Sequence, residues 1–279
     1  MKLIAESTSK STEWALVEGS QLAHRFTTEG INPFFQTRRD ISRSIRLSLP
    51  LDYFKHNKVK HVYYYGVGCS TANKRNIVEA SLIAQFRTPV NVESNMLGAA
   101  RGLFRSETGI ACILGMDTNT CLYDGTHIVK NICPGGYLLG DEGSEAVLGK
   151  LFLADLIKEL MPISLLTQFY DSIKLDRAGL LRVLYDEPNP ARYLSDICGF
   201  LLAHSHEEYV NDLIVKNFKD LFRRNIRRYD YKKHKIRFVG SAAVNFKEQL
   251  LHVAHEYDAH VDLITDSFLT GLIEYHAES

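Results

Sequence analysis

The sequence predicts an α/β protein with two domains. In both halves of the chain, short apolar runs alternate with longer segments of helical period, as in domains that pack helices against sheets. A pattern of strand, polar turn and strand occurs near the N-terminus and again from Gly109, which we interpret as a weak internal repeat. At 279 residues, 45% of them hydrophobic, the chain is long for one core and sufficient for two.

The first domain is expected over residues 1–105. Its opening hairpin joins the apolar runs 3–5 and 14–17 through a turn rich in Ser and Thr. The run Val62-Tyr63-Tyr64-Tyr65 is β-branched and aromatic, which favours a strand. Further strands are expected at 22–26 and 90–92, and helices at 38–47, 73–86 and 95–104.

The second domain is expected over residues 106–265, with a helical insertion. It begins with a hairpin whose strands are 110–114 and 121–123, and a further strand is expected at 127–132. After Gly143 the apolar period is helical, at positions such as Leu165 and Phe169 and later Leu213 and Phe218. The remaining expected elements are a loop at 186–190, strands at 236–239 and 261–264, a turn at 240–243, and helices at 246–257 and 269–276. We expect the last helix, within 266–279, to join the first domain.

The segment from Gly135 to Lys150 is the strongest candidate for a ligand site. Its glycines let the backbone form turns, and Asp141 or Ser144 can cap the helix that follows. Asp141 and Glu142 would then lie at an exposed edge, suited to the hydroxyl groups of a polar ligand. The alternative is that both carboxylates serve only the start of the helix.

Composition excludes several partners. The formal net charge is zero, which argues against bulk binding to nucleic acid or to an anionic membrane. No apolar run is long enough for a signal peptide or a membrane span. The five cysteines are odd in number and lack a CxxC pair, so we expect reduced thiols and a cytoplasmic protein.

Two polar patterns have plain interpretations. The basic stretch 223–235 contains tyrosines, as a patch for single-stranded nucleic acid can, but the polar face and exit of a long helix explain it better. The histidine pairs 204/206 and 252/255 lack a third ligand, so we expect no metal there. The two hairpin turns and the Gly240-Ser241 turn remain as candidates for a nucleotide site. Such turns can present backbone N–H groups to phosphate, beside a carboxylate that holds Mg²⁺.

The motifs along the chain resemble one family over nearly its whole length. They include Glu13-Trp14-Ala15-Leu16, Gly30-Ile31-Asn32-Pro33, Leu97-Gly98-Ala99-Ala100-Arg101-Gly102, Gly140-Asp141-Glu142-Gly143-Ser144 and Val239-Gly240-Ser241-Ala242. In these motifs the chain is similar to the N-acetylglucosamine kinases and the related BadF-type ATPases, of the actin, Hsp70 and sugar kinase superfamily. The resemblance implies two ribonuclease-H-like (actin-like ATPase) domains with an interdomain cleft for ATP, Mg²⁺ and an amino sugar, and a homodimer.

The resemblance also assigns roles to individual residues. Glu6 would stand at the metal position, and Asn95 at the position of the family's catalytic base. Nucleotide contacts would come from Ser7, Thr8, Ser9, Lys10, Thr12, Asp117, Thr118, Gly240 and Ser241. Sugar contacts would come from Asn32, Met116, Asn119 and Asp141.

Three departures from the family's pattern bear on activity. Asn95 replaces an Asp, and an amide cannot accept the proton of a sugar hydroxyl, which typically costs about 10²- to 10⁴-fold in rate. Thr8 and Asp117 replace glycines of the two phosphate loops. We therefore expect a kinase-like protein for ATP-dependent phosphorylation of an amino sugar, with an eroded active site. The alternative is a non-catalytic sugar-binding or regulatory pseudokinase; a redox-activator role would need clustered cysteines, which are lacking.

Overall fold

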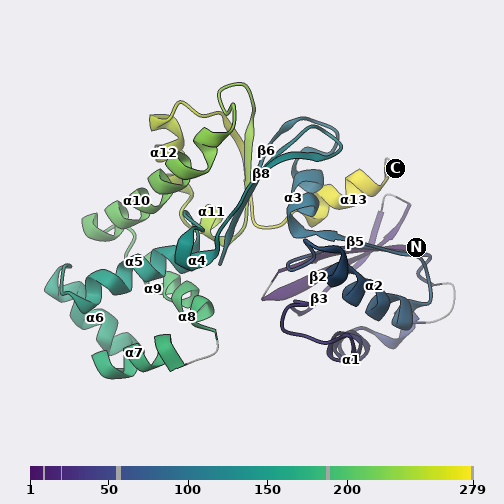
Figure 1. Ribbon diagram of the computed structural model, residues 1–279, viewed down its shortest axis with the longest axis horizontal. Helices are drawn as coiled ribbons and strands as arrows, with labels where there is room; N and C mark the ends of the chain where they lie inside the picture. The colour runs from purple at the N-terminus through teal and green to yellow at the C-terminus, as the bar shows by residue number, and fades with distance from the viewer. Residues whose placement is uncertain (9, 20, 55–57, 187–188, 278–279) are drawn as a thin grey trace. The chain divides into compact units, whose positions relative to one another are not determined.

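The computed structural model describes residues 1–8, 10–19, 21–54, 58–186 and 189–277. The chain divides into two compact units (Figure 1). Unit 1 comprises Met1–Ala111, Tyr123–Val129 and Ser267–Ser279, and unit 2 comprises Cys112–Leu122 and Lys130–Asp266. The domain boundaries expected from the sequence, 1–105 with 266–279 and 106–265, stay a prediction.

Unit 1 contains a mixed five-stranded sheet in the order β3-β2-β1-β4-β5. The strands are β1 (Lys2–Ser7), β2 (Ser11–Glu18), β3 (Gln21–Glu29), β4 (His61–Gly66) and β5 (Val90–Ser94). The first three are antiparallel neighbours, whereas β1, β4 and β5 run parallel. Since Ser7 is paired with Gly66, and Gly66 with Ser94, these three parallel strands end at the same edge of the sheet.

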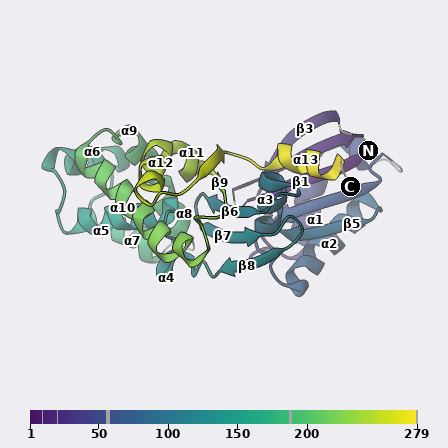
Figure 2. The same cartoon turned by 90° about the horizontal axis from the view of Figure 1, so that it is seen from above.

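Helices cover this sheet (Figure 2). They are α1 (Arg38–Ser48), the 3-10 turn η1 (Leu51–Phe54), α2 (Ala72–Phe86), α3 (Asn95–Phe104) and α13 (Leu269–Ala277). Thr37 and Asp40 form a capping box at the start of α1, and the Ser94 hydroxyl accepts from the Leu97 N–H at the start of α3. A Cβ at Gly271 would lie 1.8 Å from the Gly102 carbonyl oxygen, so α13 crosses α3 at a distance that requires glycine.

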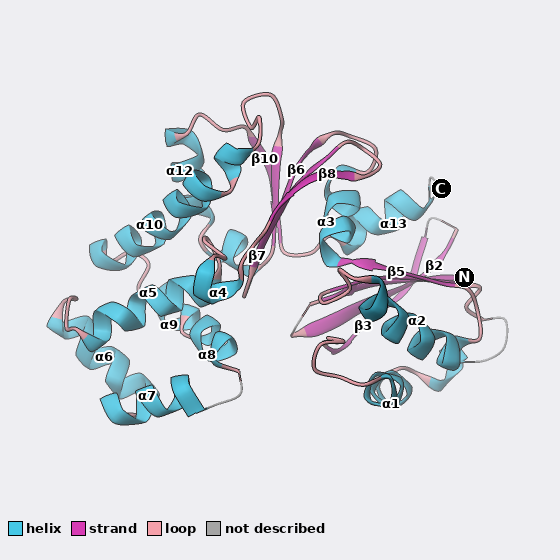
Figure 3. Cartoon of the chain, in the orientation of Figure 1, coloured by secondary structure: helices cyan, strands magenta, loops and turns pink. Residues whose placement is uncertain are grey.

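The second sheet has the order β10-β9-β6-β7-β8. Its strands are β6 (Gly109–Leu114), β7 (Thr118–Tyr123), β8 (Ile128–Ile132), β9 (Ile236–Val239) and β10 (Val261–Thr265). The helices of unit 2 are α4 (Gly136–Leu139), α5 (Glu145–Ile157), α6 (Ile163–Ile173), α7 (Arg177–Asp186), α8 (Pro190–Asp196), α9 (Cys198–Ala203), α10 (Glu208–Arg224), the 3-10 turn η2 (Ile226–Arg228), α11 (Ser241–Asn245) and α12 (Lys247–Glu256). Figure 3 distinguishes these helices from the strands and loops.

The mixed α/β class predicted from the sequence is confirmed, with two local differences. The short helix α4 was not expected, and the expected turn at 240–243 is the start of helix α11. Both helices are too short to show an apolar period, which needs several turns. The expected loop at 186–190 includes Glu187 and Pro188, which lie outside the described residues.

Three further features bear on the expected partners. Within the described ranges, no helix combines the length and the apolar character that crossing a bilayer requires. Nor do the described residues include a group of three or more His, Cys, Asp or Glu side chains arranged to hold a metal ion. None of the five cysteines forms a disulfide, and of these Cys133 alone is exposed.

Candidate functional site

The turn between β1 and β2 is held by its own residues. The Thr8 hydroxyl accepts from the N–H groups of Lys10 (3.2 Å) and Ser11 (3.1 Å). The Thr8 N–H donates to the Ser11 carbonyl at 2.8 Å. These three N–H groups are therefore satisfied inside the turn, and in this arrangement they are not available to a phosphate. Ser9, expected to contact nucleotide, lies outside the described residues.

Glu6, the expected metal position, is bonded within unit 1. Its Oε2 accepts from the Ser267 hydroxyl at 2.6 Å and from the Phe268 N–H at 3.1 Å. Burial raises the pKa of the Glu6 carboxyl to about 7, a rise that the Ser267 hydrogen bond partly offsets. The carboxylate thus serves the segment that leads into α13, and together with the closed turn it does not fit a Mg²⁺-phosphate group in this arrangement.

The other expected residues of unit 1 surround the edge at which β1, β4 and β5 end. Ser7 and Thr12 are buried and share a hydrogen bond of 2.7 Å between their hydroxyls. The Asn32 side-chain oxygen accepts from the Phe34 N–H at 3.0 Å, which forms an Asx turn. Asn95 is half-buried and is the first residue of α3. The structure therefore brings Ser7 and Asn95 to one edge of this sheet.

In unit 2, the turn between β6 and β7 lies against the start of α11. Gly240 has φ +120°, and a Cβ there would come 2.4 Å from the Leu114 carbonyl oxygen. A Cβ at Gly115 would lie 3.8 Å from the Ser241 hydroxyl. The two turns that the resemblance assigns to nucleotide therefore lie side by side. Asp117 is half-buried in the first of them, and burial raises its pKa, with a further contribution from the charge of Glu145.

Asp141 is buried, and the expected exposed position of its carboxylate is wrong. The residue is 5% exposed, and its backbone adopts a left-handed φ of +55°. Among the residues that the structure describes, no donor reaches Asp141 Oδ1. Burial, and secondarily the negative charge of Asp117, raise the pKa of Asp141 to about 7. Asp141 is thus a buried carboxyl with one unsatisfied oxygen.

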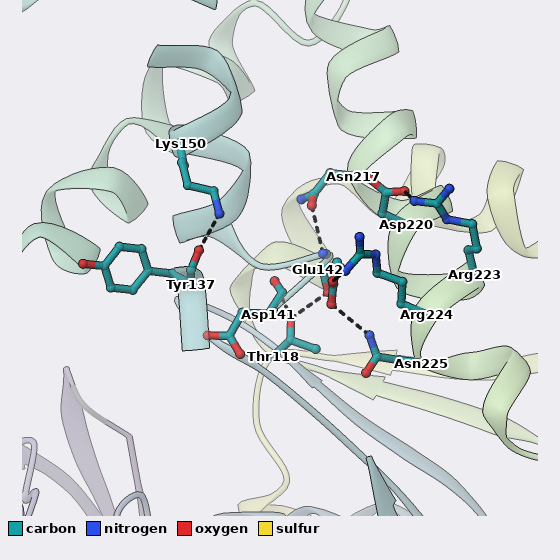
Figure 4. A network of polar contacts seen from close by, with 11 residues as sticks. Thr118, Tyr137, Asp141, Glu142, Lys150, Asn217, Asp220, Arg223, Arg224 and Asn225 are labelled. Atoms are coloured by element: carbon teal, nitrogen blue, oxygen red, sulfur yellow. Dashed lines mark hydrogen bonds and ion pairs between the residues drawn. The ribbon is translucent and has the colours of Figure 1, made fainter. Parts of the chain in front are cut away.

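The backbone around Asp141 is fixed from two sides (Figure 4). The Thr118 hydroxyl is 3.3 Å from the Asp141 carbonyl oxygen and 3.0 Å from that of Glu142. From α10, the Asn217 amide accepts from the Gly143 N–H at 2.9 Å and donates to the Ser144 carbonyl at 3.1 Å. A buried polar network that is satisfied in this way fixes one conformation of the segment.

Glu142 does not share the environment of Asp141. Its carboxylate pairs with Arg224 at 3.1 Å and accepts from the Asn225 amide at 3.2 Å. At the start of α5, the Ser144 hydroxyl accepts from the Val147 N–H at 3.1 Å, so Ser144 is the N-cap. Neither Asp141 nor Glu142 is the capping residue.

One of the expected sugar contacts, Asn119, points away from Asp141. Asn119 adjoins Thr118 on β7, so its side chain points to the opposite face of the sheet, where its oxygen accepts from the Asn131 amide at 2.8 Å. The Met116 carbonyl accepts from the Ala146 N–H at 3.3 Å, which ties the turn to α5 through backbone. The structure therefore groups Asp117, Thr118 and Asp141, and separates Asn119 from them.

Sequence reasoning missed Asn217 and Ser267. Asn217 lies 74 residues from the glycine it contacts, and Ser267 lies 261 residues from Glu6. Each is a common polar residue without a local motif. The sequence offered one signal for Asn217: it is a polar residue on the apolar face of α10. A helix face that packs inward seldom carries an amide unless the amide has a hydrogen-bond partner.

No protein-family model matches the chain, and no curated protein matches it. Solved structures do. A provisionally assigned N-acetylglucosamine kinase from Porphyromonas gingivalis is 37% identical, with a TM-score of 0.96 over 100% of this chain and 99% of the other. A second provisionally assigned N-acetylglucosamine kinase, from Chromobacterium violaceum, is 12% identical, with a TM-score of 0.74 over 100% of this chain and 98% of the other.

A third similar structure extends the comparison of the fold. The ADP-bound MreB5 protein of Spiroplasma citri is 10% identical, with a TM-score of 0.59 over 99% of this chain and 94% of the other. At that identity the match shows the fold alone, and the fold is that of the actin-like ATPases with two domains. The match at 37% identity over the full length goes further. The chain belongs to the N-acetylglucosamine kinase-like family of the actin-like ATPase superfamily.

Proposed function

We propose that this protein binds an amino sugar through Asp141 and is a sugar kinase-like protein with an eroded phosphate-transfer site. The observation that carries the proposal is the unsatisfied Oδ1 of the buried Asp141. Leaving a buried acceptor without a donor costs about 1–3 kcal/mol, and more when it is charged. A sugar hydroxyl would supply the missing hydrogen bond. The names of two similar structures suggest N-acetylglucosamine as the sugar.

The contacts of the residues that the resemblance assigns to Mg²⁺ and ATP indicate that phosphoryl transfer to the sugar would be slow. The N–H groups of the first turn are bonded to Thr8 and Ser11, and Glu6 is bonded to the segment before α13. ATP with Mg²⁺ would supply the phosphoryl group, but binding it requires these contacts to open. Asn95 cannot remove the proton of the acceptor hydroxyl. Transfer would then depend on positioning and charge neutralisation alone.

A second candidate is a non-catalytic sugar-binding protein. The closed turn at Thr8 favours it, because satisfied N–H groups give phosphate no advantage over water. The two candidates share sugar binding and differ in whether a phosphorylated product forms. We include in both the homodimer that the resemblance implies and the cytoplasmic location that the cysteine content predicts.

The test is calorimetric titration of the purified protein with N-acetylglucosamine and, separately, with Mg-ATP, followed by a product assay on the same sample. Binding of both ligands with slow formation of sugar phosphate supports the kinase-like proposal. Sugar binding without ATP binding or product supports the non-catalytic candidate. Absence of sugar binding would reject both.

A further inference from the structure

The C-terminal end of α10 contributes to a basic pocket that the sugar proposal does not use. The cavity has a volume of about 380 Å³. It lies within unit 2, where the segment from Ile132 to Gly135 and the segment from Leu139 to Glu142 meet the end of α10 and η2. Pockets that hold small molecules begin at about 300 Å³, so a ligand the size of a monosaccharide derivative fits here.

The charges of the lining are unbalanced. Three arginines, Arg223, Arg224 and Arg228, line the cavity together with one carboxylate, Glu142, so the lining has a surplus of positive charge. Asp220 pairs with Arg223 at 2.7 Å from outside the lining and reduces this surplus without cancelling it. Lys130 adds a further cation nearby, since its ammonium donates to the Arg228 carbonyl.

Helix stability explains part of this cluster but not all of it. Cations in the last turn of a helix are favourable, and both Arg223 and Arg224 occupy the last turn of α10 and have carboxylate partners. Arg228 lies beyond that helix, in η2, and in the part of the chain that the structure describes no carboxylate pairs with its guanidinium. A guanidinium at the wall of a cavity is suited to a phosphate, which it can bind through two N–H groups.

We propose that this pocket binds a phosphomonoester of monosaccharide size, with Arg228 as its principal contact. A phosphomonoester is close to a dianion above pH 7, because its second pKa is about 6, so its charge complements the surplus of the lining. Arg224 and Asn225 now bond to Glu142 in the same cavity, and the phosphate would compete with that carboxylate for them. The proposal goes beyond the sugar site and does not depend on it.

Cys133 provides a local reporter of occupancy. It is a free, exposed thiol, and it lines the same cavity. The experiment measures the rate at which iodoacetamide alkylates Cys133 in the full chain, by mass spectrometry of the Cys133 peptide. The probes are inorganic phosphate and N-acetylglucosamine 6-phosphate at pH 8, with sodium chloride at matched ionic strength as the control for screening.

We expect phosphate to slow alkylation at least fivefold at saturation, and Arg228→Ala to abolish the protection. Arg227→Ala is the matched control, since Arg227 is an exposed arginine of the same turn that does not line the cavity, and it should keep the protection. Protection at lower concentration by the sugar phosphate would identify it as the ligand, whereas equal protection would identify the phosphate group alone. Equal protection by sodium chloride, or full protection in Arg228→Ala, would overturn the proposal.

Discussion

The first turn of unit 1 and the Asp141 segment of unit 2 differ in whether their polar groups are satisfied within the protein. Both carry polar groups that the resemblance assigns to ligand binding, the first in the turn after β1 and the second between α4 and α5. In the first turn, the Thr8 hydroxyl satisfies two backbone N–H groups. In the second, Thr118 and Asn217 fix the backbone, yet Asp141 keeps an unsatisfied oxygen. The first turn therefore satisfies its own N–H groups, whereas the second is fixed but keeps a buried acceptor without a donor.

The largest expected effect comes from restoring the family's residues. The variant Asn95→Asp with Thr8→Gly and Asp117→Gly should raise the rate of sugar phosphorylation by about 10²- to 10⁴-fold, because it supplies a general base and frees the N–H groups of the first turn. A coupled assay for ADP release measures it. The control is the double variant Thr8→Gly with Asp117→Gly, which keeps Asn95 and should gain much less. No gain in either variant would count against latent kinase activity.

Next in size is the effect of Asp141→Asn on sugar affinity. The amide keeps the size of the side chain but replaces one acceptor oxygen by a donor, so affinity for N-acetylglucosamine should fall about 10- to 100-fold. Titration calorimetry measures the change. Asp212→Asn, at an exposed position on α10, should bind sugar as the unmodified protein does. Equal affinity of the two variants would remove Asp141 from the sugar site.

The same variant should change how stability depends on pH. Because the pKa of Asp141 is raised in the folded protein to about 7, the folded state holds its proton more tightly than the unfolded state, and stability falls as pH rises from about 4 to about 7. Asp141→Asn removes this loss, so its gain over the unmodified protein should be near zero at pH 4 and about 4 kcal/mol above pH 7. Urea unfolding at several pH values measures it, with Asp212→Asn as control. If the stability gain of Asp141→Asn did not depend on pH, ionisation of the Asp141 carboxyl would not be the cause of the lower stability at high pH.

The smallest expected effect tests the clamp from α10. Asn217→Ala should lower the free energy of unfolding by about 1–3 kcal/mol and weaken sugar binding several-fold, because the segment that carries Asp141 loses both Asn217 hydrogen bonds. Asn211→Ala is its partner variant: Asn211 also lies on α10 and accepts from Gln249 at 3.1 Å, away from the segment. It should cost stability without weakening sugar binding. If both variants weaken sugar binding equally, Asn217 has no specific positioning role.

The sequence was informative wherever structure depends on neighbours along the chain. The strands, the longer helices and the cap at Ser144 follow from apolar period and from side chains three residues away from the groups they bond. The environments of Glu6 and Asp141 could not be predicted, because burial and partners distant in sequence decide them. Ser267 and Asn217 carry no motif that points to these contacts.

The contact between Glu6 and the segment at Ser267 has a consequence for biosynthesis. Unit 1 is assembled from residues at both ends of the sequence, and α13 packs on α3 and against β1. A ribosome makes all of unit 2 before it makes α13, so until then the first sheet lacks the two hydrogen-bond partners of Glu6, and one face of α3 is uncovered. Unit 2 can therefore complete its folding first. We therefore expect a chaperone that acts during synthesis to bind unit 1 rather than unit 2.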